Sequence, residues 1–265
     1  MTIVFAVANQ KGGVGKTTTS VNLAASLGLM NREVLLIDLD PQGNATMGSG
    51  MEKKELPHSI YDVLIGEKSA EESLVKAEAA GYDVLGANSD LIGAEIELLD
   101  LDRREYRLKD ALLGFAGRYD FIVLDCPPAL GVLTLNGLVA SDSVIIPMQC
   151  EYYALEGLTA LLDTIDRISS SLNPKLKVEG LLRTMYDPRN SLSRDVSLHL
   201  IDHFGDAVYR TIVPKNVRLA EAPSYGVPVH FYDKYSRGSK AYLALAGEVL
   251  NRHPEASYKS GEGGD

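Results

Sequence analysis

A glycine-rich turn near the N-terminus restricts the folds that this chain can adopt. Residues 10–18 have the sequence Gln-Lys-Gly-Gly-Val-Gly-Lys-Thr-Thr, and the preceding residues 3–8 are apolar and rich in β-branched side chains. Such a run is typical of a buried parallel strand, and residues 17–30, which contain no proline, predict a helix. A strand, a glycine-rich turn and a helix in this order predict a phosphate-binding loop in an α/β sheet.

The residue types in the turn suit a bound phosphate. Its glycines allow the backbone to approach an anion closely, and the helix N-terminus supplies favourable partial positive charge. Lys16 is expected to reach the terminal phosphates of a nucleotide, and the Thr17 hydroxyl is expected to bind Mg²⁺. Gln10 stands where the common pattern has its first glycine. The predicted nucleotide-binding residues of the turn are Lys11, Gly12, Gly13, Val14, Gly15, Lys16, Thr17 and Thr18.

Lys11 is a second cation on the same turn, more than the β- and γ-phosphates of one nucleotide need. It either meets a second phosphate or is a solvated surface lysine. The sequence Lys-Gly-Gly-x-Gly-Lys-Thr-Thr resembles the deviant Walker A motif of the ParA, MinD and nitrogenase iron-protein class of P-loop ATPases. This resemblance implies an ATP-sandwich homodimer in which Lys11 reaches the partner's nucleotide and assists catalysis together with Lys16.

Two apolar strands are expected to end in acidic residues, at 34–40 and at 121–125. The carboxyl ends of parallel strands are where open α/β sheets hold their ligands. Asp125 matches the Walker B aspartate, which holds Mg²⁺ through water. Asp40 resembles the switch residue that orients the attacking water beside the γ-phosphate. Asp38 is expected to support either the Mg²⁺ water or the loop itself.

The alternation of apolar segments along the chain predicts an α/β fold with a doubly wound, mostly parallel sheet and helices on both faces. Further strands are predicted at 82–86, 121–125, 143–148 and 178–184. Further helices are predicted at 59–64, 91–99, 107–115, 155–171, 193–204 and 240–251. We expect one ATPase domain over residues 1–253 and a disordered, acidic tail over 254–265.

The overall composition indicates a cytoplasmic protein. The chain has two cysteines, and no run of its sequence approaches membrane-spanning length. The net charge of −10 speaks against nucleic acid as a partner, but the charge is unevenly distributed. Residues 1–150 hold 12 Lys and Arg against 21 Asp and Glu, whereas residues 151–265 hold 14 against 15. A DNA-binding surface would therefore be a local stripe in the second half of the chain.

Two segments of the second half resemble the ParA/Soj partition ATPases. In the segment 213–226, the resemblance places Pro214 and Asn216 at the adenine. In the loop 187–190, it assigns a DNA-contacting role to Arg189, and we add Arg218 as a second contact to the phosphate backbone. Weaker candidates for the same surface are Arg194, Lys215 and Lys240. The alternative for each arginine is a solvated charge, or an ion pair with Asp187 or Glu221.

The resemblance implies a chromosome- or plasmid-partition ATPase that is associated with the nucleoid. Its ATP-bound dimer would bind double-stranded DNA without sequence preference, because affinity grows with the number of phosphates neutralised. A ParB-like DNA-binding activator would stimulate a slow intrinsic hydrolysis and release the DNA.

Three alternatives remain open from the sequence. A ParA-like ATPase could position another cargo with the same biochemistry. A MinD-like ATPase would bind a membrane through its last helix, here 240–251, although the tail that follows is acidic rather than basic. An iron–sulfur protein like the nitrogenase iron protein would use Cys126 and Cys150, although buried packing is the usual role of free cysteine.

Overall fold

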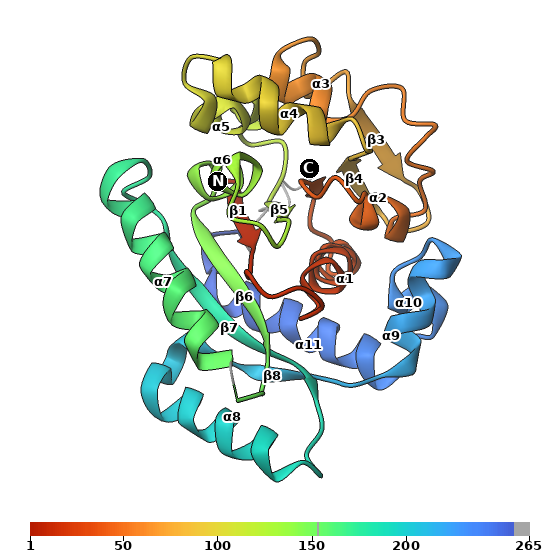
Figure 1. Ribbon diagram of the computed structural model, residues 1–265. Helices are drawn as coiled ribbons and strands as arrows, with labels where there is room; N and C mark the ends of the chain where they lie inside the picture. The colour runs from red at the N-terminus through yellow and green to blue at the C-terminus, as the bar shows by residue number, and fades with distance from the viewer. Residues whose placement is uncertain (153, 257–265) are drawn as a thin grey trace, which may run out of the picture.

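The computed structural model describes residues 1–152 and 154–256, and a single sheet forms its centre (Figure 1). The strands are β1 Ile3–Val7, β2 Val34–Asp38, β3 Leu74–Ala77, β4 Tyr82–Leu85, β5 Phe121–Asp125, β6 Ser143–Gln149, β7 Lys177–Tyr186 and β8 Val208–Pro214. They lie in the order β3-β4-β2-β5-β1-β6-β7-β8, and each neighbouring pair is parallel except β3 with β4. The predicted mostly parallel α/β sheet is confirmed.

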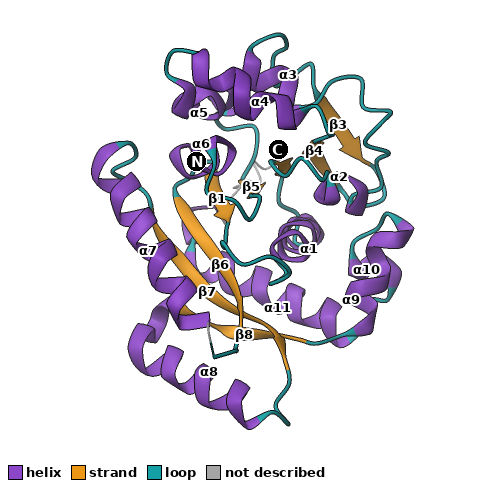
Figure 2. Ribbon diagram, viewed as in Figure 1, coloured by secondary structure: helices purple, strands orange, loops and turns teal. Residues whose placement is uncertain are grey.

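Helices cover both faces of the sheet (Figure 2). They are α1 Lys16–Leu29, α2 Asn44–Gly48, α3 Ile60–Ile65, α4 Leu91–Glu97, α5 Arg107–Ala111, α6 Val132–Ala140, α7 Ala154–Ser171, α8 Ser191–Phe204, α9 Val217–Glu221, α10 Val229–Tyr232 and α11 Arg237–Arg252. Side chains of β1 divide between the faces because successive residues of a strand point in opposite directions. Phe5 and Val7 pack with α1 and α11, whereas Ala6 packs with α6 and α7.

The sequence predicted the central strands and the longer helices, but it missed several short elements. The missed elements are β3, β8, α2, α6, α9 and α10. The predicted helix 107–115 is α-helical only to Ala111, and its remainder is the 3₁₀ helix Leu112–Phe115. Strand β3 also makes the sheet mixed, because it pairs antiparallel with β4 at the edge.

The ordered chain continues past residue 253, where we had expected the domain to end. Pro254–Ala256 forms a short 3₁₀ helix, and the side chain of Ala256 is buried in the core. The disordered tail that we predicted over 254–265 is therefore wrong for its first three residues. Its remainder, 257–265, lies outside the described residues.

The last helix, α11, belongs to the core. Its apolar side chains Tyr242, Leu245 and Val249 are buried against α1 and the sheet. A helix packed in this way has no free apolar face to lay on a bilayer. This packing argues against the membrane-binding role that the MinD-like alternative would give to residues 240–251.

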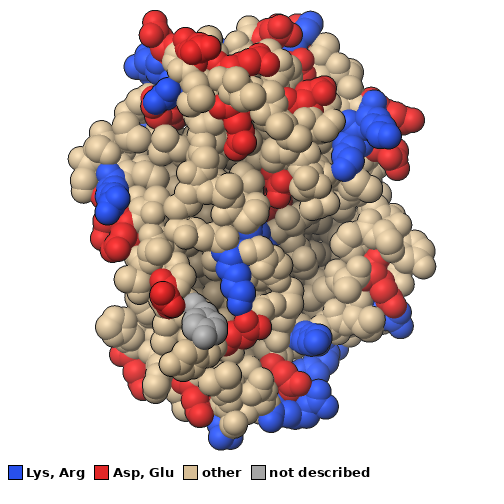
Figure 3. All heavy atoms as spheres, viewed as in Figure 1, with Lys and Arg blue, Asp and Glu red and all other residues tan. Residues whose placement is uncertain are grey.

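Charge is distributed unevenly over the face seen in Figure 3. Asp and Glu predominate over the helices at the top of the view, which carries α3, α4 and α5 in Figure 1. Lys and Arg gather at the lower right, between the loop that follows β7 and the connection from β8 to α9. The basic patch thus lies in the second half of the chain, despite the overall charge of −10.

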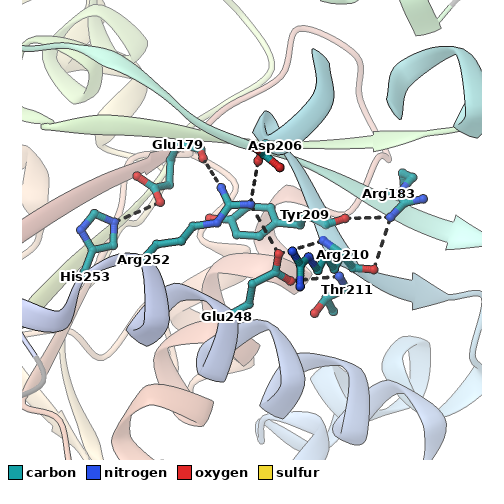
Figure 4. A network of polar contacts seen from close by, with 9 residues as sticks. All are labelled: Glu179, Arg183, Asp206, Tyr209, Arg210, Thr211, Glu248, Arg252 and His253. Carbon is teal, nitrogen blue, oxygen red and sulfur yellow. Dashed lines mark hydrogen bonds and ion pairs between the residues drawn. The ribbon is translucent and has the colours of Figure 1, made fainter. Parts of the chain in front are cut away.

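Polar contacts fasten the end of α11 to β7 and β8 (Figure 4). The Arg252 guanidinium lies 4.1 Å from the centre of the Tyr209 ring and donates to the carbonyl oxygen of Glu179 at 2.7 Å. The Glu248 carboxylate accepts from backbone N–H groups of β8 at 2.8 and 3.0 Å. His253 Nε2 and Glu179 Oε1 lie 3.0 Å apart and are both buried. These contacts hold β8, which leads to α9, in a fixed position.

Candidate nucleotide-binding site

The glycine-rich turn joins β1 to α1 at the carboxyl end of the central strands. Gly13 and Gly15 adopt positive φ angles of 73° and 89°, and Gly15 is the residue immediately before α1. A side chain at either position would strain the backbone, because only glycine adopts this region freely. No atom among the described residues lies within 4 Å of the place that a Cβ of Gly12 or Gly13 would take. The turn therefore borders open space at these two glycines, as a phosphate-binding loop requires.

Lys16 begins α1 and lies inside this turn. Its side chain is largely buried, and its Nζ donates to the carbonyl oxygen of Lys11 at 3.3 Å. Burial lowers the pKa of the Lys16 ammonium, although the carboxylates of Asp125 and Asp40 act in the opposite direction. A cation held in a poorly solvated place near carboxylates interacts strongly with a phosphate that enters it. This position agrees with the phosphate-binding role predicted for Lys16.

Asp125 and Asp38 end the neighbouring strands β5 and β2 in direct register, and both side chains are fully buried. The Ser20 hydroxyl donates to Asp125 Oδ1 at 2.9 Å, whereas Asp125 Oδ2 has no hydrogen-bond partner among the described residues. Burial, with the nearby charge of Asp38, raises the pKa of Asp125 to about 8. A buried carboxylate oxygen without a partner, next to a second carboxylate, is a fitting environment for a divalent cation.

Asp38 organises the turn that follows β2. Its Oδ2 accepts from the backbone N–H and the hydroxyl of Thr46, each at 2.8 Å, and its Oδ1 accepts from the Asp40 N–H at 3.1 Å. Burial raises the pKa of Asp38 to about 6 in spite of these hydrogen bonds. Of the two roles considered for Asp38, the contacts therefore support the loop. Thr46 also accepts from the Ala87 N–H at 2.9 Å and so ties this turn to the end of β4.

Asp40 lies at the start of this turn and is partly exposed. Its Oδ1 accepts from the Gln42 N–H at 2.9 Å, which stabilises a tight local turn. The turn leads through Gly43, at a positive φ of 63°, into α2. The role of Asp40 in orienting the attacking water remains a prediction.

A cavity of about 550 Å³ adjoins the glycine-rich turn. Its lining is mainly apolar and includes Pro214 and Asn216, which the family resemblance places at the adenine. The Asn216 side chain also caps α9, because its Oδ1 accepts from the Arg218 N–H at 3.0 Å. The complete lining is Gly15, Thr18, Thr184, Met185, Val213, Pro214, Lys215, Asn216, Val217, Leu219, Ala220 and Tyr242. The size and position suit a purine base whose phosphates lie on the turn.

Sequence reasoning missed Thr184 and Met185, at the end of β7. The Thr184 hydroxyl donates to the carbonyl oxygen of Val14 at 2.7 Å, and this bond joins β7 to the glycine-rich turn. Met185 has a φ of 49°, which is uncommon for a residue with a side chain. This conformation is a signal that only the structure could provide, since the sequence Thr-Met carries no recognisable pattern.

Lys11 lies on the surface and pairs with Glu151, which sequence reasoning did not identify. Its Nζ donates to Glu151 Oε2 at 2.6 Å, and about half of each side chain is exposed. Within one subunit Lys11 is therefore not directed at the space inside the turn. Its predicted contact with a nucleotide on a partner subunit would require this ion pair to open.

Neither Arg189 nor Arg218 lines the nucleotide cavity, and each is paired with acidic side chains of its own chain. Arg189 pairs with Asp187 through two side-chain hydrogen bonds of 2.8 and 3.0 Å. Arg218 donates to Glu221 at 2.8 Å and lies 3.4 Å from an oxygen of Asp233. Both ion pairs considered from the sequence are thus present. The weaker candidates Arg194, Lys215 and Lys240 lie at the start of α8, after β8 and in the first turn of α11.

The iron–sulfur alternative finds no support. Cys126 and Cys150 are both buried, and burial raises the pKa of each thiol, that of Cys150 to about 11. Buried neutral thiols cannot bridge a cluster between two subunits. Within residues 1–152 and 154–256, no three His, Cys, Asp or Glu side chains are grouped so that they could hold a metal ion. In the same part of the chain, no helix is long and apolar enough to cross a membrane.

Comparison with known proteins agrees with this site. A family model described as an AAA domain matches residues 2–178. The chromosome partitioning protein ParA of Caulobacter vibrioides is 51% identical over 259 residues, which cover 97% of each chain. The sporulation initiation inhibitor protein Soj of Bacillus subtilis is 51% identical over 246 residues, or 93% of this chain and 97% of Soj.

A solved structure matches over the same length. The crystal structure of a Mycobacterium smegmatis protein named cobyrinic acid a,c-diamide synthase, with bound ADP and magnesium, superposes with a TM-score of 0.84. It is 42% identical and covers 98% of each chain.

Proposed function

Because the chain belongs to the AAA-domain family of ParA and Soj partitioning ATPases, we propose that it is an ATPase whose ATP-bound homodimer binds DNA without sequence preference. Hydrolysis of ATP would release the DNA. One of the similar solved structures carries the name of a synthase, but the two curated relatives at 51% identity are a chromosome partitioning protein and Soj. We therefore favour partition of a chromosome or plasmid, with a ParB-like DNA-binding protein as the activator.

The observation that best supports this proposal is that α9 lines the nucleotide cavity and also carries an exposed cation. Val217, Leu219 and Ala220 line the cavity, whereas the intervening Arg218 is exposed and forms its ion pair on the outside. A helix of five residues thus contributes to both sites. A base that enters the cavity contacts the same helix that presents a cation to DNA, so that nucleotide occupancy can influence the DNA surface directly.

A second contact links the segment that follows α2, and through it the turn after β2, to the segment that follows α9. The segment after α2 contacts the segment after the 3₁₀ helix Ala222–Tyr225, where Gly50 and Gly226 meet at positive φ angles of 87° and 63°. A Cβ on Gly50 would lie only 2.8 Å from the carbonyl oxygen of Gly226, so the two backbones fit only as glycines. A displacement of the Asp40 turn by a γ-phosphate would therefore press on the segment that follows α9.

The residues present fit Mg²⁺ and ATP. Thr17 and Asp125 would hold the metal, with Asp38 supporting the turn beside it, and bound Mg²⁺ would neutralise charge on the β- and γ-phosphates. Lys16 would bind the phosphates, Asp40 would orient the attacking water, and Lys11 of the partner subunit would add positive charge during hydrolysis. Pro214 and Asn216 would border the adenine.

The test is DNA binding as a function of nucleotide. Fluorescence anisotropy with a random-sequence duplex should show tight binding in the presence of Mg²⁺ and a slowly hydrolysed ATP analogue, and weak binding with ADP. The matched variants are Arg218→Gln and, as a control distant from the basic surface, Arg103→Gln, which removes a cation paired with Asp110. Equal affinity for DNA in the two nucleotide states would refute the proposed switch. Retained affinity and salt dependence in Arg218→Gln would move the DNA surface away from α9.

A further inference from the structure

Strand β8 does not pair with β7 in a uniform register. While β7 advances two residues, from Leu181 to Arg183, the paired residues of β8 advance four, from Val208 to Ile212. Residues 209–211 therefore form a bulge in β8. A bulge bends a strand and redirects the residues that follow it, and beyond this bulge β8 enters the lining of the nucleotide cavity.

Two charged side chains bond the backbone of this bulge (Figure 4). Arg183, from β7, donates through Nη2 to the carbonyl oxygens of Tyr209 at 2.7 Å and Arg210 at 3.3 Å. The Glu248 carboxylate, from α11, accepts from the N–H groups of Arg210 and Thr211 at 2.8 and 3.0 Å. Hydrogen bonds of this kind, in which one partner is charged, are stronger than those between neutral groups. We call Arg183 and Glu248 together the β8 clamp.

Arg183 is an unusual residue for the interior of a sheet. Its side chain is only 5% exposed. Besides the two carbonyl oxygens of the bulge, it donates through Nη1 to the Ser197 hydroxyl at 2.9 Å, and its Nε has no hydrogen-bond partner among the described residues. Burial of a charge is costly unless hydrogen bonds compensate it. Most of that compensation comes from the bulge, so the bulge accounts for a cation at this position.

The β8 clamp lies next to the wall of the nucleotide cavity without forming part of it. Within the described residues, neither Arg183 nor Glu248 lines the cavity, whereas Thr184 and Met185, which follow Arg183, line its β7 side. Residues 213–217, which follow the bulge, line its β8 side. Strand β7 is also paired with β6, but β8 is the edge strand of the sheet. Loss of the clamp would therefore shift β8 rather than β7.

We propose that Arg183 and Glu248 are positioning residues for recognition of the nucleotide base, because they fix the β8 side of the cavity against the β7 side. They act through the backbone of residues 209–211 and do not contact the nucleotide. This inference rests on the proposed function, in which the cavity holds the adenine of ATP. The glycine-rich turn joins β1 to α1, so its binding of phosphate does not depend on the clamp.

A comparison of two ligands separates base binding from phosphate binding. Calorimetric titration of the full chain with Mg²⁺–ATP measures both, and titration with Mg²⁺–tripolyphosphate, which has no base, measures phosphate binding alone. In Arg183→Met, affinity for ATP should fall about tenfold, the loss expected for one hydrogen bond to a charged group. Glu248→Gln keeps one acceptor oxygen and should lose about threefold. Affinity for tripolyphosphate should stay unchanged in both variants. A merely structural role would lower both affinities together.

Arg210→Gln is the matched control. It changes an exposed side chain of the same bulge and keeps the backbone groups that bond to the clamp, so it should bind both ligands as the wild type does. A loss of ATP affinity in this control as large as that in Arg183→Met would overturn the specific role of the clamp. Equal losses for the two ligands in Arg183→Met and Glu248→Gln, or no loss in either variant, would also overturn it.

Two further observations keep the test decisive. Tripolyphosphate binding reports whether a variant has folded, and if Arg183→Met does not fold, the milder Glu248→Gln decides: a selective loss of ATP affinity supports the clamp, and an equal loss for both ligands refutes it. A wild type that binds ATP no more tightly than tripolyphosphate would instead contradict the base site of the proposed function. Tight ATP binding by the wild type with no selective loss in the variants would contradict the clamp alone.

Discussion

Replacement of Asp125 by asparagine tests whether the two buried carboxylates are built for a cation rather than for stability. Asp125 titrates in the folded protein at a pKa of about 8, because it is buried and lies beside Asp38. In the unfolded chain it titrates near 3.9. A group with a raised folded pKa of this kind destabilises the fold as pH rises above the unfolded value, and the loss is complete above the folded value.

The size of the expected change in the free energy of unfolding follows from the pH range between the unfolded and the folded pKa of Asp125. Between pH 5.5 and 7.5 the carboxyl is mostly protonated in the folded protein and ionised in the unfolded chain. Each pH unit then lowers the free energy of unfolding of the wild type by about 1.4 kcal/mol relative to Asp125→Asn. From pH 5.5 to pH 7.5, the free energy of unfolding of the variant should rise by about 2 to 3 kcal/mol relative to that of the wild type. The unpaired amide N–H that asparagine introduces costs about 1 to 3 kcal/mol, but this cost does not change with pH.

The assay is urea unfolding of the nucleotide-free protein at both pH values. The Asp125→Asn side chain keeps an oxygen that can accept from Ser20, so the variant should fold. Asp163→Asn, an exposed position on α7, is the control and should change the free energy of unfolding little. Mg²⁺ with ATP analogue should stabilise the wild type and much less the variant, because the carboxylate that we propose holds the metal is gone. A difference between Asp125→Asn and the wild type that stays constant from pH 5.5 to 7.5 would refute the reasoning.

Three further predictions concern single side chains. Lys16→Ala should lose measurable binding of Mg²⁺–ATP in calorimetry, because its buried ammonium is the cation inside the turn; tight binding in this variant would contradict the phosphate-binding role. Asp40→Ala should persist as an ATP-bound dimer in light scattering with little phosphate release, and rapid turnover would argue against its water-orienting role. His253→Gln should destabilise the protein more at pH 6 than at pH 9. Burial lowers the pKa of His253, but its contacts with Glu179 and Glu255 outweigh burial and raise it, so this stabilisation is present below the unfolded pKa and is lost as pH rises through the folded one. If His253→Gln lowered the free energy of unfolding in urea equally at pH 6 and pH 9, the stabilising role of protonated His253 would be contradicted.

The sequence was sufficient for those parts of the site that depend on local order. A strand that leads through a glycine-rich turn into a helix is encoded in consecutive residues, so the position of Lys16 followed directly; Asp125 followed from the apolar strand that it ends. Neighbouring parallel strands then placed Asp38 and Asp125 together, as their register shows. These inferences needed only the alternation of strands and helices and the rule that ligands lie at the carboxyl ends of parallel strands.

The remaining parts depend on contacts between segments that are distant in sequence. Glu151 lies 140 residues from Lys11, and Thr184 lies 170 residues from Val14, so no spacing in the chain predicts either pair. Strand β3 is short and only partly buried, and it therefore lacks the apolar run by which the central strands were found. Arg183 appears as an ordinary strand residue until the fold places it beside the bulge of β8.

The ion pairs within one subunit suggest a reason why dimerisation and DNA binding would be coupled. Within one subunit, three cations that we assign to phosphates are already paired with carboxylates of their own chain. The pairs are Lys11–Glu151, Arg189–Asp187 and Arg218–Glu221. Each phosphate contact is then an exchange of one oxyanion for another, and exposed ion pairs of this kind contribute at most about 1 kcal/mol each. A single exchange changes affinity little, so useful DNA affinity must come from many exchanges made together. The proposed ATP-bound dimer would double the number of pairs that face DNA, Arg189–Asp187 and Arg218–Glu221, and this doubling would let nucleotide control DNA binding through quaternary structure.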